Sequence, residues 1–185
     1  MDSISLIGFM GSGKSSVGKE LARLLPDHMF IDLDDYIEDM LGKTIPEIFE
    51  QGGEEAFRAL EKDALESIFI KGEMSGKPCI LSLGGGTVTT EACRRIVRRN
   101  TICFYLRASI DTLVYNLETW PGDRPMLQSE KDLSSRVEEL MASRSEVYET
   151  TAHSIIDVDG NDYPAVALEI ARSLDKHTDN GLKDI

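Results

Sequence analysis

The residues whose types and spacing most clearly predict chemistry are Gly8-Phe9-Met10-Gly11-Ser12-Gly13-Lys14-Ser15, which read G-x-x-x-x-G-K-S. An apolar run from Ile4 to Ile7 precedes them, and apolar residues at helical spacing follow from Val17 to Leu25. This order of strand, glycine loop and helix is what a phosphate-binding P-loop requires. The alternative is a glycine-rich turn that binds nothing, and the flanking patterns favour the P-loop.

Each residue type in this stretch suits the binding of a nucleoside triphosphate. Glycines allow backbone conformations in which N–H groups surround phosphate oxygens at a helix N-terminus. Lys14 would supply a cation to the β- and γ-phosphates, and the Ser15 hydroxyl would be a ligand for Mg²⁺. The predicted ATP-binding residues of the loop are Gly11, Ser12, Gly13, Lys14, Ser15 and Ser16.

Two aspartates, Asp32 and Asp34, follow the next apolar run, Met29-Phe30-Ile31. Since they lie two apart where a strand runs out, both side chains can point to the same side. One could bind Mg²⁺ directly or through water, and the other could accept a proton from a substrate hydroxyl. A helix cap or a turn is the simpler alternative, and the preceding P-loop favours a functional pair.

Two arginines lie on helical stripes that are otherwise apolar. Arg144 recurs with Val137, Met141 and Tyr148 at spacings of three and four, and Arg58 has a similar place before Leu65. Charged side chains seldom face inward unless they are paired. The residues alone leave two interpretations open, a structural salt bridge such as Arg58 with Glu61, or a bidentate clamp on a small carboxylate.

Short apolar runs separated by helical patterns predict how these residues are positioned. The runs cover residues 4–7, 29–31, 79–83, 101–106 and 154–158. Because they are almost continuously apolar and alternate with helices, they predict an α/β fold with a parallel sheet covered on both faces. Ligands bind beyond the carboxyl ends of such strands. The glycine loop, the aspartate pair and the triple glycine at 84–86 all fall at these ends.

One domain over residues 1–175 accounts for this pattern, with a frayed polar tail at 176–185. The segment 118–129, which contains Trp120-Pro121-Gly122-Asp123-Arg124-Pro125, interrupts it because two prolines and a glycine oppose a regular helix. It is interpreted as a mobile lid over the site, with a plain surface loop as the alternative.

Composition excludes several other classes of protein. The net charge of −13 argues against a nucleic-acid partner. The three cysteines have no metal-ligand spacing and the three histidines are scattered, so we expect a reduced, cytoplasmic protein without a transition metal. No apolar run approaches the ~20 residues that span a bilayer, so no membrane segment is expected.

Taken together, these residues resemble the shikimate kinase family over nearly the whole chain. The P-loop alone is shared with many NTPases, but the ordered set of motifs is specific. The matching segments are G-F-M-G-S-G-K-S from Gly8, D-L-D from Asp32, G-x-x-I-x-x-I-F from Gly42, G-E-x-x-F-R-x-x-E from Gly53, L-G-G-G from Leu83, R-P-M-L from Arg124 and R-x-x-x-Y-x-x-x-A from Arg144. The resemblance implies a P-loop kinase with five parallel strands, a substrate-binding helical region near 33–61 and a lid near 118–129.

The resemblance also implies a reaction, in which the γ-phosphoryl of ATP passes to the 3-hydroxyl of shikimate. Asp34 would receive the hydroxyl proton, and Lys14 and the lid residue Arg124 would stabilise the transferring group. Mg²⁺ would be held by Ser15 and, through water, by Asp32. We expect no partner beyond shikimate and ATP, and a monomer.

The acceptor site implied by the resemblance is built from side chains and glycine backbone. Arg58 and Arg144 would hold the shikimate carboxylate, and Glu61 would steady Arg58. Backbone groups of two glycines would reach substrate oxygens, and apolar side chains would line the ring. These further residues are Gly85, Gly86, Ile45, Phe49 and Phe57.

The chain departs from the family pattern at Leu117, where an arginine that stacks on adenine is usual. We hypothesise that Trp120, the single tryptophan, takes over this stacking. Two rival functions would also use a P-loop. A kinase for another hydroxy acid, such as gluconate, would not obviously need the two inward arginines. A guanine-nucleotide switch would need an N-K-x-D segment, which the sequence lacks.

Overall fold

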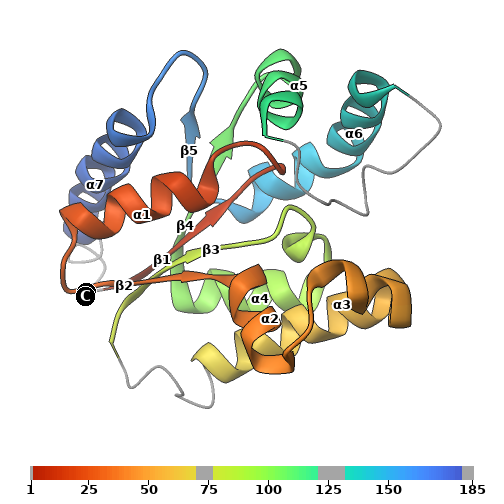
Figure 1. The fold of residues 1–185 in the computed structure, drawn as a ribbon. Coiled ribbons are helices and arrows are strands. Elements are labelled where there is room, and N and C mark those ends of the chain that lie inside the picture. The colour runs from red at the N-terminus through yellow and green to blue at the C-terminus, as the bar shows by residue number, and fades with distance from the viewer. Residues whose placement is uncertain (1, 70–76, 121–131, 181–185) are drawn as a thin grey trace.

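The computed structural model describes residues 2–69, 77–120 and 132–180. Strands and helices alternate along most of the chain (Figure 1). The elements are β1 (Ser3–Ile7), α1 (Lys14–Leu24), β2 (Met29–Asp32), α2 (Leu33–Leu41), α3 (Ile45–Phe69), β3 (Cys79–Ser82), the 3-10 turn η1 (Thr87–Thr89), α4 (Glu91–Asn100), β4 (Thr101–Arg107), α5 (Ile110–Thr119), α6 (Leu133–Thr151), β5 (Ser154–Asp157) and α7 (Tyr163–Asn180).

The five strands form one sheet in the order β2-β3-β1-β4-β5, and every neighbouring pair is parallel. This confirms the predicted α/β fold with a five-stranded parallel sheet. The strand β1 is central, so the loop that follows it lies in the middle of the carboxyl edge of the sheet. Since β3 pairs in parallel with β1, and β2 with β3, the residues that follow all three strands reach the same edge.

Alternation along β1 distributes its side chains between two buried layers. Ile4 and Leu6 pack in one cluster with residues of α1 and α7, whereas Ile7 packs in the other with residues of α2 to α6. In Figure 1, α1 and α7 lie together on one side of the sheet, and α3 and α4 lie on the other. Both faces are therefore covered, and only the strand ends are left for a ligand.

Three boundaries differ from the predicted ones. The sequence pattern predicts a helix from about Tyr36 to Leu41, but α2 begins three residues earlier, at Leu33, because the side chain of Asp32 caps it by accepting the backbone N–H of Asp34 at 3.1 Å. The helix α7 continues to Asn180, past the tail boundary expected after residue 175. The first two residues of the expected lid, Glu118 and Thr119, are the last residues of α5.

The sequence predicts a helix from Ile45 to about Ile70 that is broken at Gly52-Gly53, and the structure confirms the break. Inside α3, Gly53 has φ 67° and ψ −170°, a conformation that an L residue with a side chain rarely adopts. The break separates a short first part, which carries Ile48 and Phe49, from a second part that carries Arg58 and Glu61. The kink thereby lets one helix present two differently oriented segments beside α2.

Two remaining expectations concern membranes and thiols. Among the residues that the structure describes, no helix is long and apolar enough to cross a bilayer. Cys79, Cys93 and Cys103 are buried free thiols. Burial raises the pKa of Cys93 and of Cys103 to about 12, so both thiols are protonated and unreactive at neutral pH.

Candidate functional site

The glycine loop takes the conformation that phosphate binding requires. Gly8, Gly11 and Gly13 have φ values of 145°, 85° and 87°, which residues with a Cβ rarely adopt. Gly13 is the N-cap of α1, so the first backbone N–H groups of the helix open into the loop. The Oγ of Ser12 is buried and has no hydrogen-bond partner within the described ranges of the chain. A buried hydroxyl of this kind is available to an oxygen-rich ligand.

Lys14 lies across the loop. Its Nζ donates hydrogen bonds to the carbonyl oxygens of Gly8 at 3.0 Å and Phe9 at 2.9 Å. The residue is only 8% exposed, so its charge is held close to the loop backbone. The lysine side chain and the loop therefore form one compact unit at the start of α1.

Ser15 joins the loop to the end of β2. Its Oγ donates to Oδ2 of Asp32 at 2.5 Å and lies 3.2 Å from the Oγ of Ser82, at the end of β3. These are hard oxygen ligands of the kind that Mg²⁺ prefers. Across the described ranges, no group of three or more His, Cys, Asp or Glu side chains could hold a metal ion.

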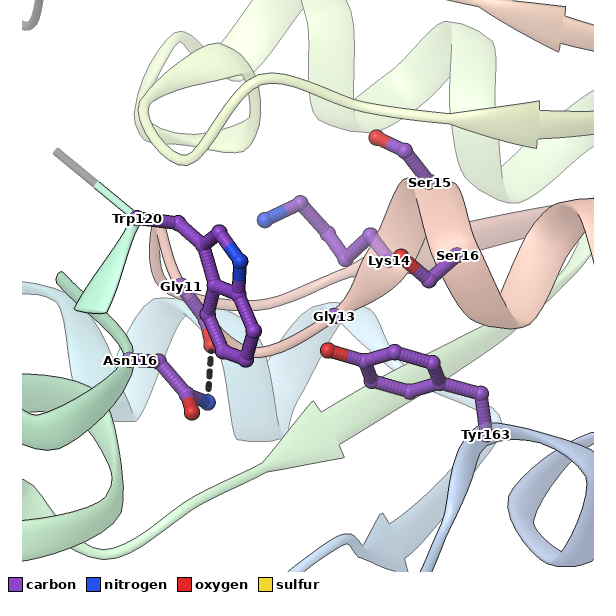
Figure 2. Close-up of a pocket in the computed structure, with 8 residues that line it drawn as sticks. All are labelled: Gly11, Gly13, Lys14, Ser15, Ser16, Asn116, Trp120 and Tyr163. Carbon is purple, nitrogen blue, oxygen red and sulfur yellow. Dashed lines mark hydrogen bonds between the residues drawn. The ribbon is translucent and has the colours of Figure 1, made fainter. Parts of the chain in front are cut away.

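A pocket with a volume of about 230 Å³ opens beside the loop (Figure 2). Four of its lining residues, Gly13, Lys14, Ser15 and Ser16, run along the start of α1. The others come from the loop itself and from two distant helices, and they are Gly11, Asn116, Trp120 and Tyr163. The amide of Asn116 donates to the carbonyl oxygen of Gly11 at 2.8 Å, which ties α5 to the loop.

Asp34 lies across the carboxyl edge from the loop. The prediction that it shares a strand with Asp32 is wrong, because β2 ends at Asp32 and Asp34 stands in the first turn of α2. Its Oδ1 is buried and has no hydrogen-bond partner among the residues that the structure describes. Burial, with smaller contributions from the nearby charges of Asp32 and Glu61, raises the pKa of Asp34 to about 7, and Lys14 opposes this rise.

Arg58 and Glu61 form a buried ion pair on the second part of α3. Nη1 of Arg58 donates to Oε2 of Glu61 at 2.5 Å, and Nη2 donates to Glu54 at 3.0 Å. The Glu61 side chain is fully buried and also accepts from Thr87 at 2.5 Å. Burial opposes the charge on Arg58, but Glu61 and Glu54 outweigh this and raise its pKa. The salt bridge that the sequence left open is therefore present.

The triple glycine is the floor between these groups. A Cβ on Gly86 would lie 2.0 Å from Nη2 of Arg58, and one on Gly84 would lie 3.1 Å from Oδ1 of Asp34. A Cβ on Gly85 would lie 3.1 Å from the backbone nitrogen of Met10, within the P-loop. The turn thus brings the acceptor side against the loop, and the absence of side chains leaves room for the charged groups.

Arg144, on α6, contacts the same triple-glycine turn. It is 5% exposed, its Nη1 donates to the carbonyl oxygen of Gly85 at 3.4 Å, and its guanidinium lies 5.9 Å from the ring centre of Phe9. The hydroxyl of Tyr148 donates to the same carbonyl. Within the described part of the chain, Arg144 has no carboxylate within salt-bridge distance. Its buried charge is therefore not balanced in the way that Arg58 is.

Aromatic rings close the acceptor side. The rings of Phe49 and Phe57 lie 4.8 Å apart, one on each side of the kink in α3. The guanidinium of Arg58 lies 5.5 Å from the centre of the Phe57 ring. These contacts place apolar surface next to the charged groups, as a small carbocyclic acid would need.

The chain matches the family model described as shikimate kinase over residues 10–175. A shikimate kinase from Thermus thermophilus is 42% identical over 178 residues, which is 95% of this chain and 91% of the relative. One from Dictyoglomus turgidum is 37% identical and covers 93% of this chain and 96% of the relative. The chain belongs to the shikimate kinase family.

Among solved structures, the shikimate kinase from Acinetobacter baumannii in complex with shikimate has a TM-score of 0.86. It is 31% identical, and the match covers 96% of this chain and 94% of the other. The fold is thus that of P-loop kinases. The activity that family membership supports is ATP-dependent phosphorylation of shikimate.

The structure brings most of the shikimate kinase motifs to one edge of the sheet. The P-loop, Asp32, Asp34, the triple glycine and Arg144 all lie there, together with the aromatic and charged residues of α3 described above. Arg124, expected in the lid, lies outside the described residues. The residues of α3 that lie at this edge, on the side expected to bind the acceptor, are Phe49, Phe57, Arg58 and Glu61.

Sequence reasoning missed two residues that line the pocket, Asn116 and Tyr163. Asn116 is one polar residue on an amphipathic helix, and its spacing carries no signal of contact with Gly11. Tyr163 follows the turn after β5, so its place at the pocket depends on the order of the strands. The signal available for Tyr163 was its position after the carboxyl end of a strand.

Proposed function

We propose that this chain transfers the γ-phosphoryl group of ATP, held on the P-loop, to the 3-hydroxyl of shikimate, held beside Asp34. The observation that carries the proposal is the environment of the Asp34 carboxyl. It has one buried, unpartnered oxygen and lies where the P-loop, the triple glycine and the Arg58–Glu61 pair meet. An acceptor hydroxyl at this point would face the phosphates across the carboxyl edge of the sheet.

The triphosphate would bind along the loop and the start of α1. The residues for this are Gly11, Ser12, Gly13, Lys14, Ser15 and Ser16, whose backbone N–H groups, hydroxyls and single ammonium match phosphate oxygens. Ser15 and, through water, Asp32 fit the Mg²⁺ that would accompany ATP. The bound ion would neutralise charge on the phosphate oxygens.

Asp34 would accept the proton of the attacking hydroxyl. A general base works best when its pKa lies near the operating pH, and burial gives Asp34 a pKa of about 7. Because the transferring group bears its charge on equatorial oxygens, the remaining task is alignment and positive charge. Lys14 would supply part of this charge, and Arg124 would supply more from the lid when the site closes and excludes water.

The carboxylate of shikimate would bind between Arg58 and Arg144. Glu61 and Glu54 hold the guanidinium of Arg58 in place, whereas Arg144 has a buried charge that an incoming carboxylate would balance. The rings of Phe49 and Phe57 would pack on the cyclohexene ring, and Gly85 and Gly86 would offer backbone groups to its oxygens.

A coupled assay of ADP release tests this function. We expect rapid release with shikimate as acceptor, and slow release with gluconate or with no acceptor. Equal rates with gluconate would favour the kinase of another hydroxy acid. A rate that does not depend on any small acceptor would favour a nucleotide-controlled switch.

A further inference from the structure

The buried carboxylate of Glu61 is divided between two hydrogen-bond donors. Its Oε2 accepts from Nη1 of Arg58 at 2.5 Å, and its Oε1 accepts from Oγ1 of Thr87 at 2.5 Å. The Glu61 side chain has no solvent exposure, so bulk water cannot replace a partner that is lost. Each donor therefore fixes one end of the carboxylate, and together they set its orientation.

Thr87 brings its hydroxyl to this carboxylate from the triple-glycine turn. It is fully buried at the start of η1, its backbone N–H donates to the carbonyl oxygen of Gly84 at 3.2 Å, and its branched Cβ restricts rotation of the side chain. A Cβ on Gly84 would lie 2.9 Å from Oε1 of Glu61 and 3.0 Å from Oγ1 of Thr87, so the turn passes directly beside their hydrogen bond. The hydroxyl thus belongs to the same turn as Gly85 and Gly86.

The Thr87 hydroxyl also favours the charged form of Glu61. Burial raises the pKa of Glu61, and the charge of Arg58 and the hydrogen bond from Thr87 both oppose this rise. An ionised Glu61 holds the guanidinium of Arg58 by a charge-assisted hydrogen bond, which is stronger than a neutral one. Asp34 lies beside the pair, but its Oδ1 has no partner among the described residues, so the hydroxyl supports Glu61 and leaves that oxygen open.

We propose that Thr87 is a positioning residue of the acceptor site, whose hydroxyl acts through Glu61 to hold the Arg58 guanidinium against the triple-glycine turn. A Cβ on Gly86 would lie 2.0 Å from Nη2 of Arg58, so the guanidinium is placed against the same turn that carries Thr87. The Arg58 side chain is 14% exposed and can meet a ligand, whereas Thr87 is fully buried and acts without touching one. The inference rests on the proposed function, in which Arg58 binds the carboxylate of shikimate.

The substitution Thr87→Val tests this role, because it keeps the shape of the side chain and removes the hydroxyl. We expect the KM for shikimate to rise about tenfold, since Arg58 loses its fixed orientation, while kcat and the KM for ATP stay within about threefold. Thr87→Ser, which keeps the hydroxyl, should hold the KM for shikimate within about threefold of the wild-type value. The matched control is Thr101→Val, because Thr101 is 7% exposed and donates to the carbonyl oxygen of Val97 at 2.8 Å, at the start of β4 and away from the site. Its KM for shikimate should not change.

A double-mutant cycle separates positioning from a general structural role. If Thr87 acts through Arg58, then Thr87→Val should raise the KM for shikimate by less than about twofold further when Arg58 is already alanine. The same rise in both backgrounds, or no rise in the wild-type background, would overturn the proposal. The variants Thr87→Ser and Thr87→Ala differ from each other only in the hydroxyl, so this pair gives the same comparison if Thr87→Val does not fold.

A readout without substrate keeps this inference separate from the proposed function. The side-chain Nε–H of Arg58, which donates to Glu54 at 3.3 Å, gives a ¹H–¹⁵N resonance that can be identified by its loss in Arg58→Lys. We expect this resonance to shift or broaden in Thr87→Val and to stay in place in Thr101→Val. An unchanged resonance in Thr87→Val would show that Thr87 does not hold Arg58. If the wild type does not phosphorylate shikimate, the proposed function fails, and the Arg58 resonance still decides the role of Thr87.

Discussion

The two sides of the site are built differently. The phosphate-binding part of the nucleotide side is one contiguous stretch, Gly8 to Ser15, in which backbone groups of a helix N-terminus face the ligand. The acceptor side is assembled from α2, α3, the triple-glycine turn and α6, and it depends on contacts between distant segments, such as those of Thr87 with Glu61 and of Arg144 with the carbonyl oxygen of Gly85. The first is a local motif, whereas the second exists only once the sheet has formed.

The difference has an electrostatic side as well. On the acceptor side, burial raises the pKa of both Asp34 and Glu61. The two arginines there differ in whether a carboxylate balances their charge. Arg58 is paired with Glu61, and Arg144 has no carboxylate partner among the described residues. We infer that Arg58 serves both stability and binding, and that Arg144 serves mainly binding.

The largest expected effect is on turnover at Asp34. The substitution Asp34→Asn removes the proton acceptor, so kcat should fall about 10²- to 10⁴-fold. The dissociation constant for ADP, measured by calorimetry, should stay within about threefold because the P-loop is untouched. Asp35→Asn, at the exposed neighbouring position, is the control. A kcat for Asp34→Asn close to that of the wild type would remove Asp34 from the mechanism.

The next effect separates the two arginines. Arg144→Ala should raise the KM for shikimate about 100-fold, since a charged hydrogen bond to the carboxylate is lost, with little change in melting temperature. Arg58→Ala should raise KM similarly but also lower the free energy of unfolding by about 3 kcal/mol, because Glu61 is left buried and unpaired.

The double variant Arg58→Ala with Glu61→Gln provides the control for this comparison. Removing the orphaned charge should restore much of the lost stability without restoring the KM for shikimate. Equal loss of stability in Arg58→Ala and Arg144→Ala, measured by urea unfolding, would contradict the division of roles.

A smaller effect is expected at the glycine floor. In Gly86→Ala the new Cβ would lie 2.0 Å from Nη2 of Arg58, so the guanidinium must move away. Because φ at Gly86 is −110°, alanine fits the backbone without strain, and folding should be kept. We expect the KM for shikimate to rise about tenfold, with a nearly unchanged affinity for ADP. An unchanged KM would show that Arg58 does not need its present position.

A further effect concerns pH. The pKa of Asp34 is about 7 in the native state against an ordinary value of 3.8, so between these values the folded protein keeps a proton that the unfolded chain has released. The free energy of unfolding therefore falls as the pH rises through this window. Between about pH 5 and pH 8, wild type should lose about 2 kcal/mol relative to Asp34→Asn. Urea unfolding with a chelator present measures this difference, and parallel curves would contradict it.

The sequence predicted the nucleotide side better than the acceptor side, for physical reasons. Local spacing was sufficient for the P-loop, the kink at Gly53 and the inward stripe that carries Arg144. It failed at Asp34, because the capping hydrogen bond of Asp32 starts α2 earlier than the apolar pattern suggests. A capping side chain can set the residue at which a helix begins, and the periodicity of apolar residues does not show this.

Contacts between distant elements were also beyond the sequence pattern. Asn116 reaches Gly11 across 105 positions, and Tyr163 covers Gly13 only because α1 and α7 pack on the same face of the sheet. The end of α7 was missed for a different reason, since a helix with a buried first part can continue through polar residues by backbone hydrogen bonds alone.

The most direct measurement is ³¹P NMR of the reaction of the purified protein with ATP, Mg²⁺ and shikimate. We predict one new phosphomonoester resonance that grows in step with ADP, coupled to the proton at C3 of shikimate. Release of inorganic phosphate without a new ester, or an ester at another hydroxyl, would contradict transfer to the 3-hydroxyl beside Asp34.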